Sequence, residues 1–153
     1  MINEILNLII TMRNRTITST DYETLKILLA DDVNNKNISS QIALHLYRII
    51  ETSQVINSEK ISENIITMNS VFIVKDFQKV TYQQKKLVYP NRNFDSELWE
   101  SLSIYDPLGL AVYGYKQNDL VDCSKYIMNN NKESKFLIEK ILFQPEASQI
   151  YYM

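Results

Sequence analysis

The sequence predicts an α+β fold in which a pair of helices precedes an antiparallel sheet of about four or five strands. Three observations support this prediction. Apolar residues recur at helical spacing in the first third of the chain, and from residue 65 they recur in short β-branched and aromatic runs. A short helix with start and stop signals, which carries both glycines of the chain, stands between two of those runs. With 45% hydrophobic residues, the chain can bury a core.

The beginning of the chain has two successive helical patterns. An apolar pattern over residues 1–12 indicates an amphipathic helix, which either packs on its own domain or makes a weak contact between two copies. Thr18 begins a capping-box-like sequence, and the apolar stripe that follows it ends at Leu29. A helix is therefore expected to begin at about residue 18.

A further striped helix completes an antiparallel helical hairpin, a short coiled-coil arm. A polar loop is predicted over 31–37, and Ser39 or Ser40 then caps a helix whose stripe ends at Ile50. Each arm has about 11–14 residues and hence a length of about 16–21 Å.

Polar residues mark the tip and the end of this hairpin. Asp31 and Asp32 lie at the tip, where they either form a solvated acidic turn or meet a cation or a basic partner. Two adjacent carboxylates are not enough to bind Mg²⁺, which needs further oxygen ligands. His45 is the only histidine and is expected to have a packing or surface role. The polar stretch 52–63 predicts a linker.

The strands of the sheet are predicted over residues 71–74, 80–89, 101–105, 120–127 and 136–143. In the second of these, the apolar face changes between Tyr82 and Leu87, which predicts a bulge near 84–86. In the last strand, the residues expected to face the core are Leu137, Ile141 and Phe143.

The stretch 106–114 predicts a short helix around which the sheet is wrapped. Asp106 is suited to the N-cap and Pro107 to the first helical position. The residues after them are apolar on every face, so the helix is expected to be buried. Gly109 indicates a close approach by another backbone segment, and Gly114 a left-handed residue that closes the helix.

Composition narrows the class of protein. The formal charge of −2 argues against a dedicated nucleic-acid binder. A single cysteine cannot form an internal disulfide and suits a reducing compartment. We find no apolar run of the roughly 20 residues that a membrane span needs, and Arg13 and Arg15 follow the apolar start, the reverse of a signal peptide. The sequence therefore favours a cytoplasmic protein without a membrane partner.

The sequence also lacks the usual catalytic motifs. Its only two glycines, Gly109 and Gly114, cannot build a glycine-rich phosphate loop. One histidine and one cysteine cannot make a zinc site of the usual kind, and Cys123 is expected to be a small core residue. We therefore expect a protein that is not an enzyme, with no catalytic residues, no cofactor and no metal.

Four groups of residues, in this order, resemble landmarks of the Gre-type transcription elongation factors (GreA and GreB), nearest to their Rnk-like branch. They are residues 66–71, 87–90, 107–111 with Gly114, and 143–147. The similarity covers about residues 18–150. Asn118 and Asp119 stand where relatives commonly have Gly-Asp, and residues 1–15 have no counterpart.

The resemblance implies a domain organisation. Residues 1–17 are then an N-terminal extension, 18–56 the short helical arm, 57–64 a linker, and 65–153 a Gre C-terminal-like domain. That domain is FKBP-like, with an antiparallel sheet wrapped on the short helix. The protein is expected to be a monomer, or a weak homodimer through residues 1–12.

The resemblance further implies that the partner is bacterial RNA polymerase, bound at the rim of its secondary channel and without direct sequence-specific nucleic-acid contact. The loop that docks on the polymerase corresponds here to Ser103, Ile104, Tyr105, Asp106, Pro107 and Leu108. A capped helix would hold this loop rigidly and present Tyr105 at a low entropic cost. The alternative is that Asp106 and Pro107 only cap the helix.

In transcript-cleavage factors of this family, acidic residues at the arm tip help to hold a catalytic Mg²⁺, and Asp31 and Asp32 occupy the matching place. An arm of about 20 Å is much shorter than the Gre arm, and catalysis does not tolerate such misplacement. We therefore expect a regulator that competes with cleavage factors. The alternatives are a cleavage cofactor that delivers Mg²⁺ through the tip acids and, more remotely, a peptidyl-prolyl isomerase by fold analogy.

Overall fold

The computed structural model describes residues 1–5, 14–91, 98–127 and 133–151. Besides a helical stretch at residues 2–5, its helices are α2 (Ser19–Asn34), α3 (Ser40–Thr52) and α4 (Pro107–Val112), with 3-10 turns η1 (Ser124–Tyr126) and η2 (Glu146–Ser148). Its strands are β1 (Thr16–Thr18), β2 (Gln54–Ile56), β3 (Val71–Asp76), β4 (Thr81–Val88), β5 (Glu100–Ser103), β6 (Leu120–Asp122) and β7 (Lys135–Phe143). The mixed α+β class is as predicted.

Five strands form one sheet in the order β5-β4-β3-β7-β6. The pairs β3–β4, β3–β7 and β6–β7 are antiparallel, whereas β4 and β5 are parallel. The prediction of a purely antiparallel sheet is therefore wrong at one edge. There the chain leaves β4 and returns to pair in the same direction before it enters α4.

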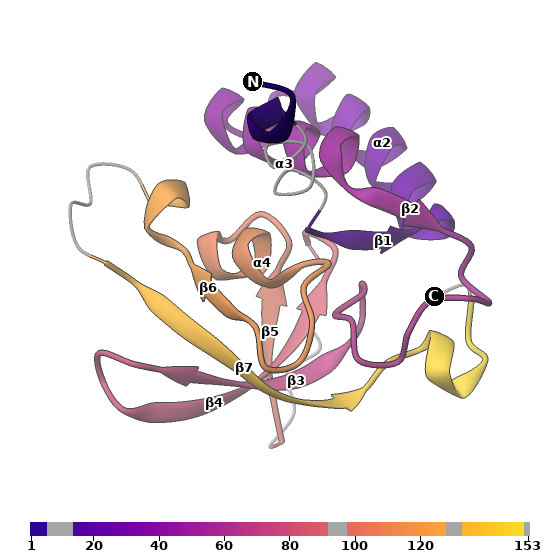
Figure 1. The fold of residues 1–153 in the computed structure, drawn as a ribbon. Coiled ribbons are helices and arrows are strands. Elements are labelled where there is room, and N and C mark those ends of the chain that lie inside the picture. The colour runs from indigo at the N-terminus through magenta and orange to yellow at the C-terminus, as the bar shows by residue number, and fades with distance from the viewer. Residues whose placement is uncertain (6–13, 92–97, 128–132, 152–153) are drawn as a thin grey trace.

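The elements are layered, as Figure 1 shows. The sheet lies at one side, α4 packs on its inner face, and α2 and α3 cover α4 from the other side. One hydrophobic core cluster joins these layers, with Leu25 and Leu46 from the helices, Phe72 from the sheet and Leu110 from α4. No helix in the described ranges is long and apolar enough to span a membrane.

A second, two-stranded sheet was not predicted. β1 and β2 pair in parallel, with Ile17 opposite Val55. β2 lies inside the stretch 52–63 that was expected to be a linker. Each strand has only three residues, too few to show an alternating pattern, so this pairing depends on the surrounding tertiary structure.

The starts of both long helices are as predicted. The Thr18 side chain accepts a hydrogen bond from the Asp21 backbone N–H at 3.0 Å. The Ser39 side chain likewise accepts one from the Ile42 backbone N–H at 3.2 Å. The loop predicted over 31–37 begins later than predicted, because α2 continues to Asn34 and only residues 35–37 of that stretch lie outside it. Of the amphipathic helix predicted over 1–12, residues 2–5 are helical, and the rest lies outside the described residues.

The bulge predicted near 84–86 is also wrong. β3 and β4 pair without a shift, and Val80 lies outside the strand, in a turn, with φ of 52°. The irregularities occur instead between β3 and β7, where the register shifts twice. As a result, Phe136 and Ile138 are buried in the first half of β7, in place of Leu137.

The strand predicted over 120–127 is shorter than expected. β6 ends at Asp122, and the 3-10 turn η1 follows Cys123. The Asp122 carboxylate accepts a hydrogen bond from the Ser124 backbone N–H at 2.9 Å, which turns the chain at this point.

Helix α4 forms where it was predicted and is mostly buried. A Cβ at Gly109 would lie 2.2 Å from the Ser103 carbonyl oxygen, so the close backbone approach is confirmed. Gly114 has φ of 81°, the left-handed conformation expected just after the helix. Asp106 occupies the N-cap position, but its side chain makes no capping bond to the helix, which corrects that part of the prediction.

Candidate functional site

The six residues predicted to dock on a partner form the segment between β5 and α4, which we call the lip (residues 103–108). Ile104 is fully buried and anchors the lip in the core, while Asp106 is exposed and the other four residues are half-buried. Ile104 N–H also donates to the Val88 carbonyl at 2.9 Å. The lip therefore begins as a continuation of the sheet.

Hydrogen bonds close the lip into a tight turn. Asp106 N–H donates to the Ser103 carbonyl at 3.0 Å, and Ser103 N–H donates to the Asp106 carboxylate at 3.2 Å. The Ser103 hydroxyl oxygen accepts from Tyr105 N–H at 3.1 Å. The Asp106 carboxylate therefore turns back to Ser103 at the end of β5 instead of capping α4. Its side chain rigidifies the lip rather than the helix.

The structure brings the two predicted site regions together. The Tyr105 hydroxyl donates a hydrogen bond to the Asp32 carboxylate at 2.5 Å. Burial, followed by this hydrogen bond, raises the pKa of Tyr105 above its usual range. The last turn of α2 therefore contacts the lip directly, a contact that no sequence pattern indicated.

Asp31 and Asp32 do not form a paired acidic site. Asp32 is only 6% exposed, whereas Asp31 is exposed and interacts with the Asn35 side-chain amide at 3.3 Å. The solvated acidic turn predicted at Asp31 and Asp32 is therefore corrected, because both residues lie in α2 and Asp32 is buried. Within the described residues, we find no group of three or more His, Cys, Asp or Glu side chains placed to hold a metal.

The other end of α2 is fixed by a second buried carboxylate. Asp21 accepts hydrogen bonds from Met68 N–H at 3.0 Å, from the Tyr89 hydroxyl at 3.3 Å and from the Tyr113 hydroxyl at 3.4 Å. Burial raises the pKa of Asp21 to about 6, and the nearby negative charge of Glu146 adds to the rise. The hydrogen bonds from Met68 and Tyr89 act in the opposite direction and lower it. The buried residues of α2 are Asp21, Leu25, Leu29 and Asp32. Helix α2 therefore lies along the rest of the protein with a carboxylate at each end of its buried stripe.

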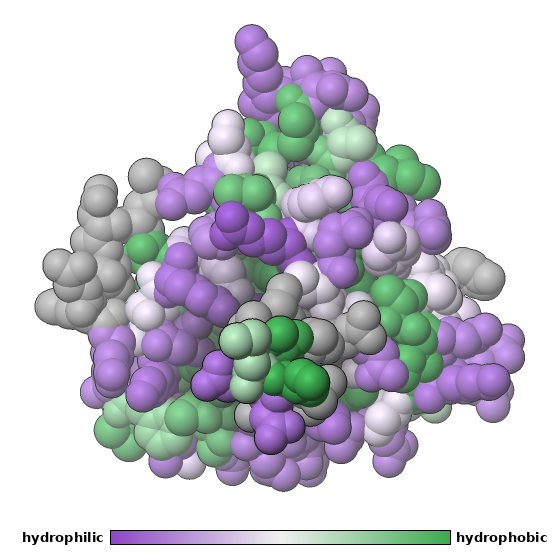
Figure 2. Space-filling model, turned by 45° about the horizontal axis from the view of Figure 1, so that its top comes forward, coloured by the Kyte–Doolittle hydropathy of each residue, from purple (hydrophilic) through white to green (hydrophobic). Residues whose placement is uncertain are grey.

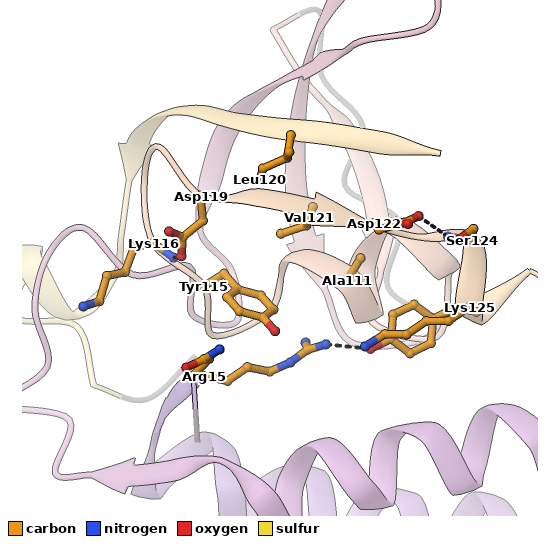
Figure 3. Close-up of a pocket in the computed structure, with 12 residues that line it drawn as sticks. Arg15, Ala111, Tyr115, Lys116, Asp119, Leu120, Val121, Asp122, Ser124 and Lys125 are labelled. Atoms are coloured by element: carbon orange, nitrogen blue, oxygen red, sulfur yellow. Dashed lines mark hydrogen bonds between the residues drawn. The ribbon is translucent and has the colours of Figure 1, made fainter. Parts of the chain in front are cut away.

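A cleft of about 560 Å³ opens between Arg15, the end of α4 and η1 (Figure 3). Arg15 is 6% exposed, and its guanidinium donates to the carbonyls of Leu110 and Tyr113, the latter at 3.0 Å. It also donates to the Tyr126 hydroxyl at 2.6 Å and lies 4.6 Å from the centre of the Tyr115 ring. Carbonyls at the end of a helix carry partial negative charge, so they stabilise this buried cation.

The acidic groups of this cleft are used by the local fold. Asp119 accepts from Lys116 N–H at 2.9 Å, and Asp122 closes the turn into η1. Figure 3 shows these carboxylates on the side of the cleft away from the guanidinium. The arrangement fastens β1 to α4. Arg15 was not predicted, because an arginine beside a short strand carries no distinguishing pattern.

His45 and Cys123 have the structural roles expected of them. The His45 ring packs edge-on against Tyr126 with centroids 5.0 Å apart, and burial, followed by Arg48 and Lys125, lowers its pKa. Cys123 is 2% exposed, and burial raises the pKa of its thiol to about 11. A neutral buried thiol is a poor nucleophile.

An apolar groove of about 970 Å³ runs between the facing parts of α2 and α3. Its apolar lining residues are Leu29, Ala30, Val33, Ile38, Ala43, Leu44 and Tyr47. Figure 2, in which the helical side of the molecule is turned forward, shows green apolar patches separated by purple polar side chains. This side of the protein is therefore mixed in character rather than uniformly charged.

Known structures provide the comparison for this fold and site. A prokaryotic transcription elongation factor GreA/GreB from Nitrosomonas europaea matches with a TM-score of 0.63 and 25% identity, over 85% of this chain and 98% of that chain. The transcription factor Gfh1 matches with a TM-score of 0.43 and 17% identity, over 86% and 99%. Gfh1 from Thermus aquaticus matches with a TM-score of 0.42 and 15% identity, over 84% and 98%. The chain matches no protein-family model and no curated protein.

The first of these similarities defines the class of fold. It spans nearly the whole of the Nitrosomonas factor, so it includes both the helices and the sheet part of this chain. The fold is that of Gre-type transcription elongation factors.

Proposed function

We propose that this protein is a non-enzymatic transcription regulator that binds bacterial RNA polymerase near its secondary channel. The observation that carries the proposal is the similarity to the Nitrosomonas elongation factor over 98% of that chain.

The lip is the proposed docking element, with Ser103, Ile104, Tyr105, Asp106, Pro107 and Leu108. Two hydrogen bonds between Ser103 and Asp106 close its turn, and the buried Ile104 anchors it. A segment that is already ordered loses little conformational entropy when a partner binds. These contacts support docking, in addition to the helix-starting role of Asp106 and Pro107.

We propose competition with transcript-cleavage factors rather than stimulation of cleavage. Delivery of a catalytic Mg²⁺ requires free carboxylate oxygens at the far end of an arm. Here Asp32 is buried against Tyr105, and only Asp31 is exposed. Helix α2 has 16 residues, hence a length of about 24 Å. The alternative, a cleavage cofactor that uses both tip acids, would need Asp32 to leave the lip.

The proposal also covers the branch of the class, the domain boundaries, the cellular location and the oligomeric state. We place the protein nearest the Rnk-like branch, with an arm at 18–56, a linker at 57–64 and an FKBP-like domain at 65–153. We also propose that it is cytoplasmic and acts without a cofactor, as a monomer or as a weak dimer through residues 1–12.

Binding to immobilised bacterial RNA polymerase tests the proposal directly. We expect a Kd of about 1 μM or tighter, corresponding to about 8 kcal/mol. Asp106→Ala removes the acceptor that closes the lip and should weaken binding about tenfold, or about 1.4 kcal/mol. Asp119→Ala is the matched control, because Asp119 also accepts a backbone N–H three residues earlier, but far from the lip. Absence of wild-type binding at tens of micromolar (roughly 6–7 kcal/mol) would overturn the proposal.

A further inference from the structure

We infer that Asp32, at the end of α2, acts as a positioning residue that holds the side chain of Tyr105 in the docking lip. This inference rests on the proposed function, because it concerns the same docking surface. It assigns to one of the two tip acids a role other than metal binding.

The hydrogen bonds within the lip hold its backbone but not the Tyr105 ring. The Asp106 and Ser103 bonds all involve backbone groups of residues 103–106. The Tyr105 ring is partly buried against the hydrophobic core, but a tyrosine side chain turns about two single bonds, so a hydrogen bond at its hydroxyl end adds a further restraint. The Asp32 carboxylate, 73 positions away in the sequence, accepts from the Tyr105 hydroxyl at 2.5 Å and supplies that restraint.

Asp32 can act as a fixed point because its own helix is held along its length. Asp21, eleven positions earlier, is three helical turns away and on nearly the same face, at about 100° per residue. Asp21 is bonded to Met68 N–H at 3.0 Å, and Leu25 and Leu29 between the two acids are in the core. The carboxylate that meets Tyr105 therefore belongs to a helix fastened at both ends.

The hydrogen bond between Tyr105 and Asp32 is of the charge-assisted type, which is stronger than a bond between neutral groups. A hydroxyl that donates to a carboxylate makes a shorter and stronger hydrogen bond than a neutral pair does. Asp32 is 6% exposed, so little water competes for its oxygen atoms. A partner would then meet a Tyr105 ring whose position is already set, which lowers the entropic cost of binding.

Affinity measurements on a small set of variants test this inference. Tyr105→Phe removes only the hydroxyl, and Asp32→Ala removes only its acceptor. Each should weaken polymerase binding about tenfold, and the double variant should be no weaker than either one, because both break the same bond. Asp32→Asn retains an oxygen acceptor and should fall between wild type and Asp32→Ala.

Two controls separate positioning from a general loss of stability. Asp31→Ala removes the neighbouring exposed carboxylate and should leave the affinity within about twofold. Tyr126→Phe removes a tyrosine hydroxyl bonded to Arg15 at the opposite end of α4 from the lip, so it should lower stability without changing the affinity. If Tyr105→Phe weakens binding but Asp32→Ala does not, Tyr105 contacts the polymerase by itself, and the inference is wrong.

Side-chain NMR of the free protein tests the positioning without any partner. We expect the ring signals of Tyr105 to change in Asp32→Ala toward those of a ring that samples several rotamers, and to stay as in wild type in Asp31→Ala. If this difference is found and wild type does not bind polymerase, the proposed function fails while the positioning stands. If the ring signals of Tyr105 are unchanged in Asp32→Ala, the inference fails whatever the affinity.

Discussion

Asp31 and Asp32 show how strongly the direction of a side chain determines its role. The two residues are consecutive in α2, and consecutive side chains of a helix point about 100° apart. Asp32 therefore lies in the buried stripe and receives the Tyr105 hydroxyl, while Asp31 faces solvent. A substitution at one position should not reproduce the effect of the same substitution at the other.

At Gly109, the direction in which an alanine substitution changes the free energy of unfolding shows how tightly α4 packs against the lip. In a helix without crowding, Gly→Ala is stabilising by up to about 1 kcal/mol. Here an added Cβ would lie 2.2 Å from the Ser103 carbonyl oxygen, so the backbone of the lip would have to move. Gly109→Ala should therefore lower the free energy of unfolding by about 3 kcal/mol, as measured by chemical denaturation. A stabilised variant would show that the approach of the two segments is not tight.

Asp21 predicts how stability changes with pH. Its pKa of about 6 in the folded protein is above the ordinary value of 3.8, because the carboxyl is buried. The folded state therefore binds the proton more tightly, and this contribution is complete below about pH 4 and is lost as the pH rises through 6. The loss amounts to about 3 kcal/mol.

The test is to measure the free energy of unfolding at several pH values between about 4 and 7. Asp21→Asn cannot ionise, so its stability should fall less across this range than that of wild type. Glu146 also has a pKa raised by burial, and its contribution should persist in the variant. Identical pH dependence in the two proteins would show that Asp21 is not the titrating group.

At the scale of elements, the hairpin between β3 and β4 contains a strained residue. Val80 has φ of 52°, and a β-branched side chain is strongly disfavoured in this left-handed region. It is also 69% exposed, so its side chain gains little from packing. Val80→Asn should raise the free energy of unfolding by about 1 kcal/mol. Val80→Thr, which is also β-branched, should give no such gain.

Arg15 links β1 to the end of α4 and to η1. Arg15→Met keeps a similar length but leaves the carbonyls of Leu110 and Tyr113 and the hydroxyl of Tyr126 without this donor. Leaving buried polar groups unsatisfied should lower the free energy of unfolding by about 3 kcal/mol. Arg48→Met on the exposed face of α3 is the matched control and should change it by less than about 0.5 kcal/mol. Similar losses in both variants would mean that Arg15 has no special role.

The ends of the helices and the close backbone approach at Gly109 could be predicted, because they depend on the types of a few neighbouring residues. Thr18, Ser39 and Gly114 have the cap conformations that their residue types favour, and Gly109 lies where two backbone segments meet. The inward face of β7 was not predictable in the same way. Register shifts opposite β3 change which residues face the core, and they depend on the neighbouring strand rather than on the sequence of β7 itself.

At the scale of the whole molecule, one core joins segments that the sequence suggested were separate. Residues of α2 and α3 share a hydrophobic cluster with β3 and α4. The α+β class could be predicted from the change of period near residue 65. The parallel pairing of β1 with β2 and the bond between Asp32 and Tyr105 could not, because both join distant positions and leave no local pattern. The candidate lip was therefore predictable as a segment, but its support by α2 was not.

The most direct test of the central claim is a competition on RNA polymerase. A labelled transcript-cleavage factor is bound to arrested elongation complexes, and this protein is then added at increasing concentration. We predict that wild type displaces the label, that Asp106→Ala does so less well than Asp119→Ala, and that the transcripts keep their length. Failure to displace the factor, or transcripts that shorten when this protein alone is added, would contradict the account.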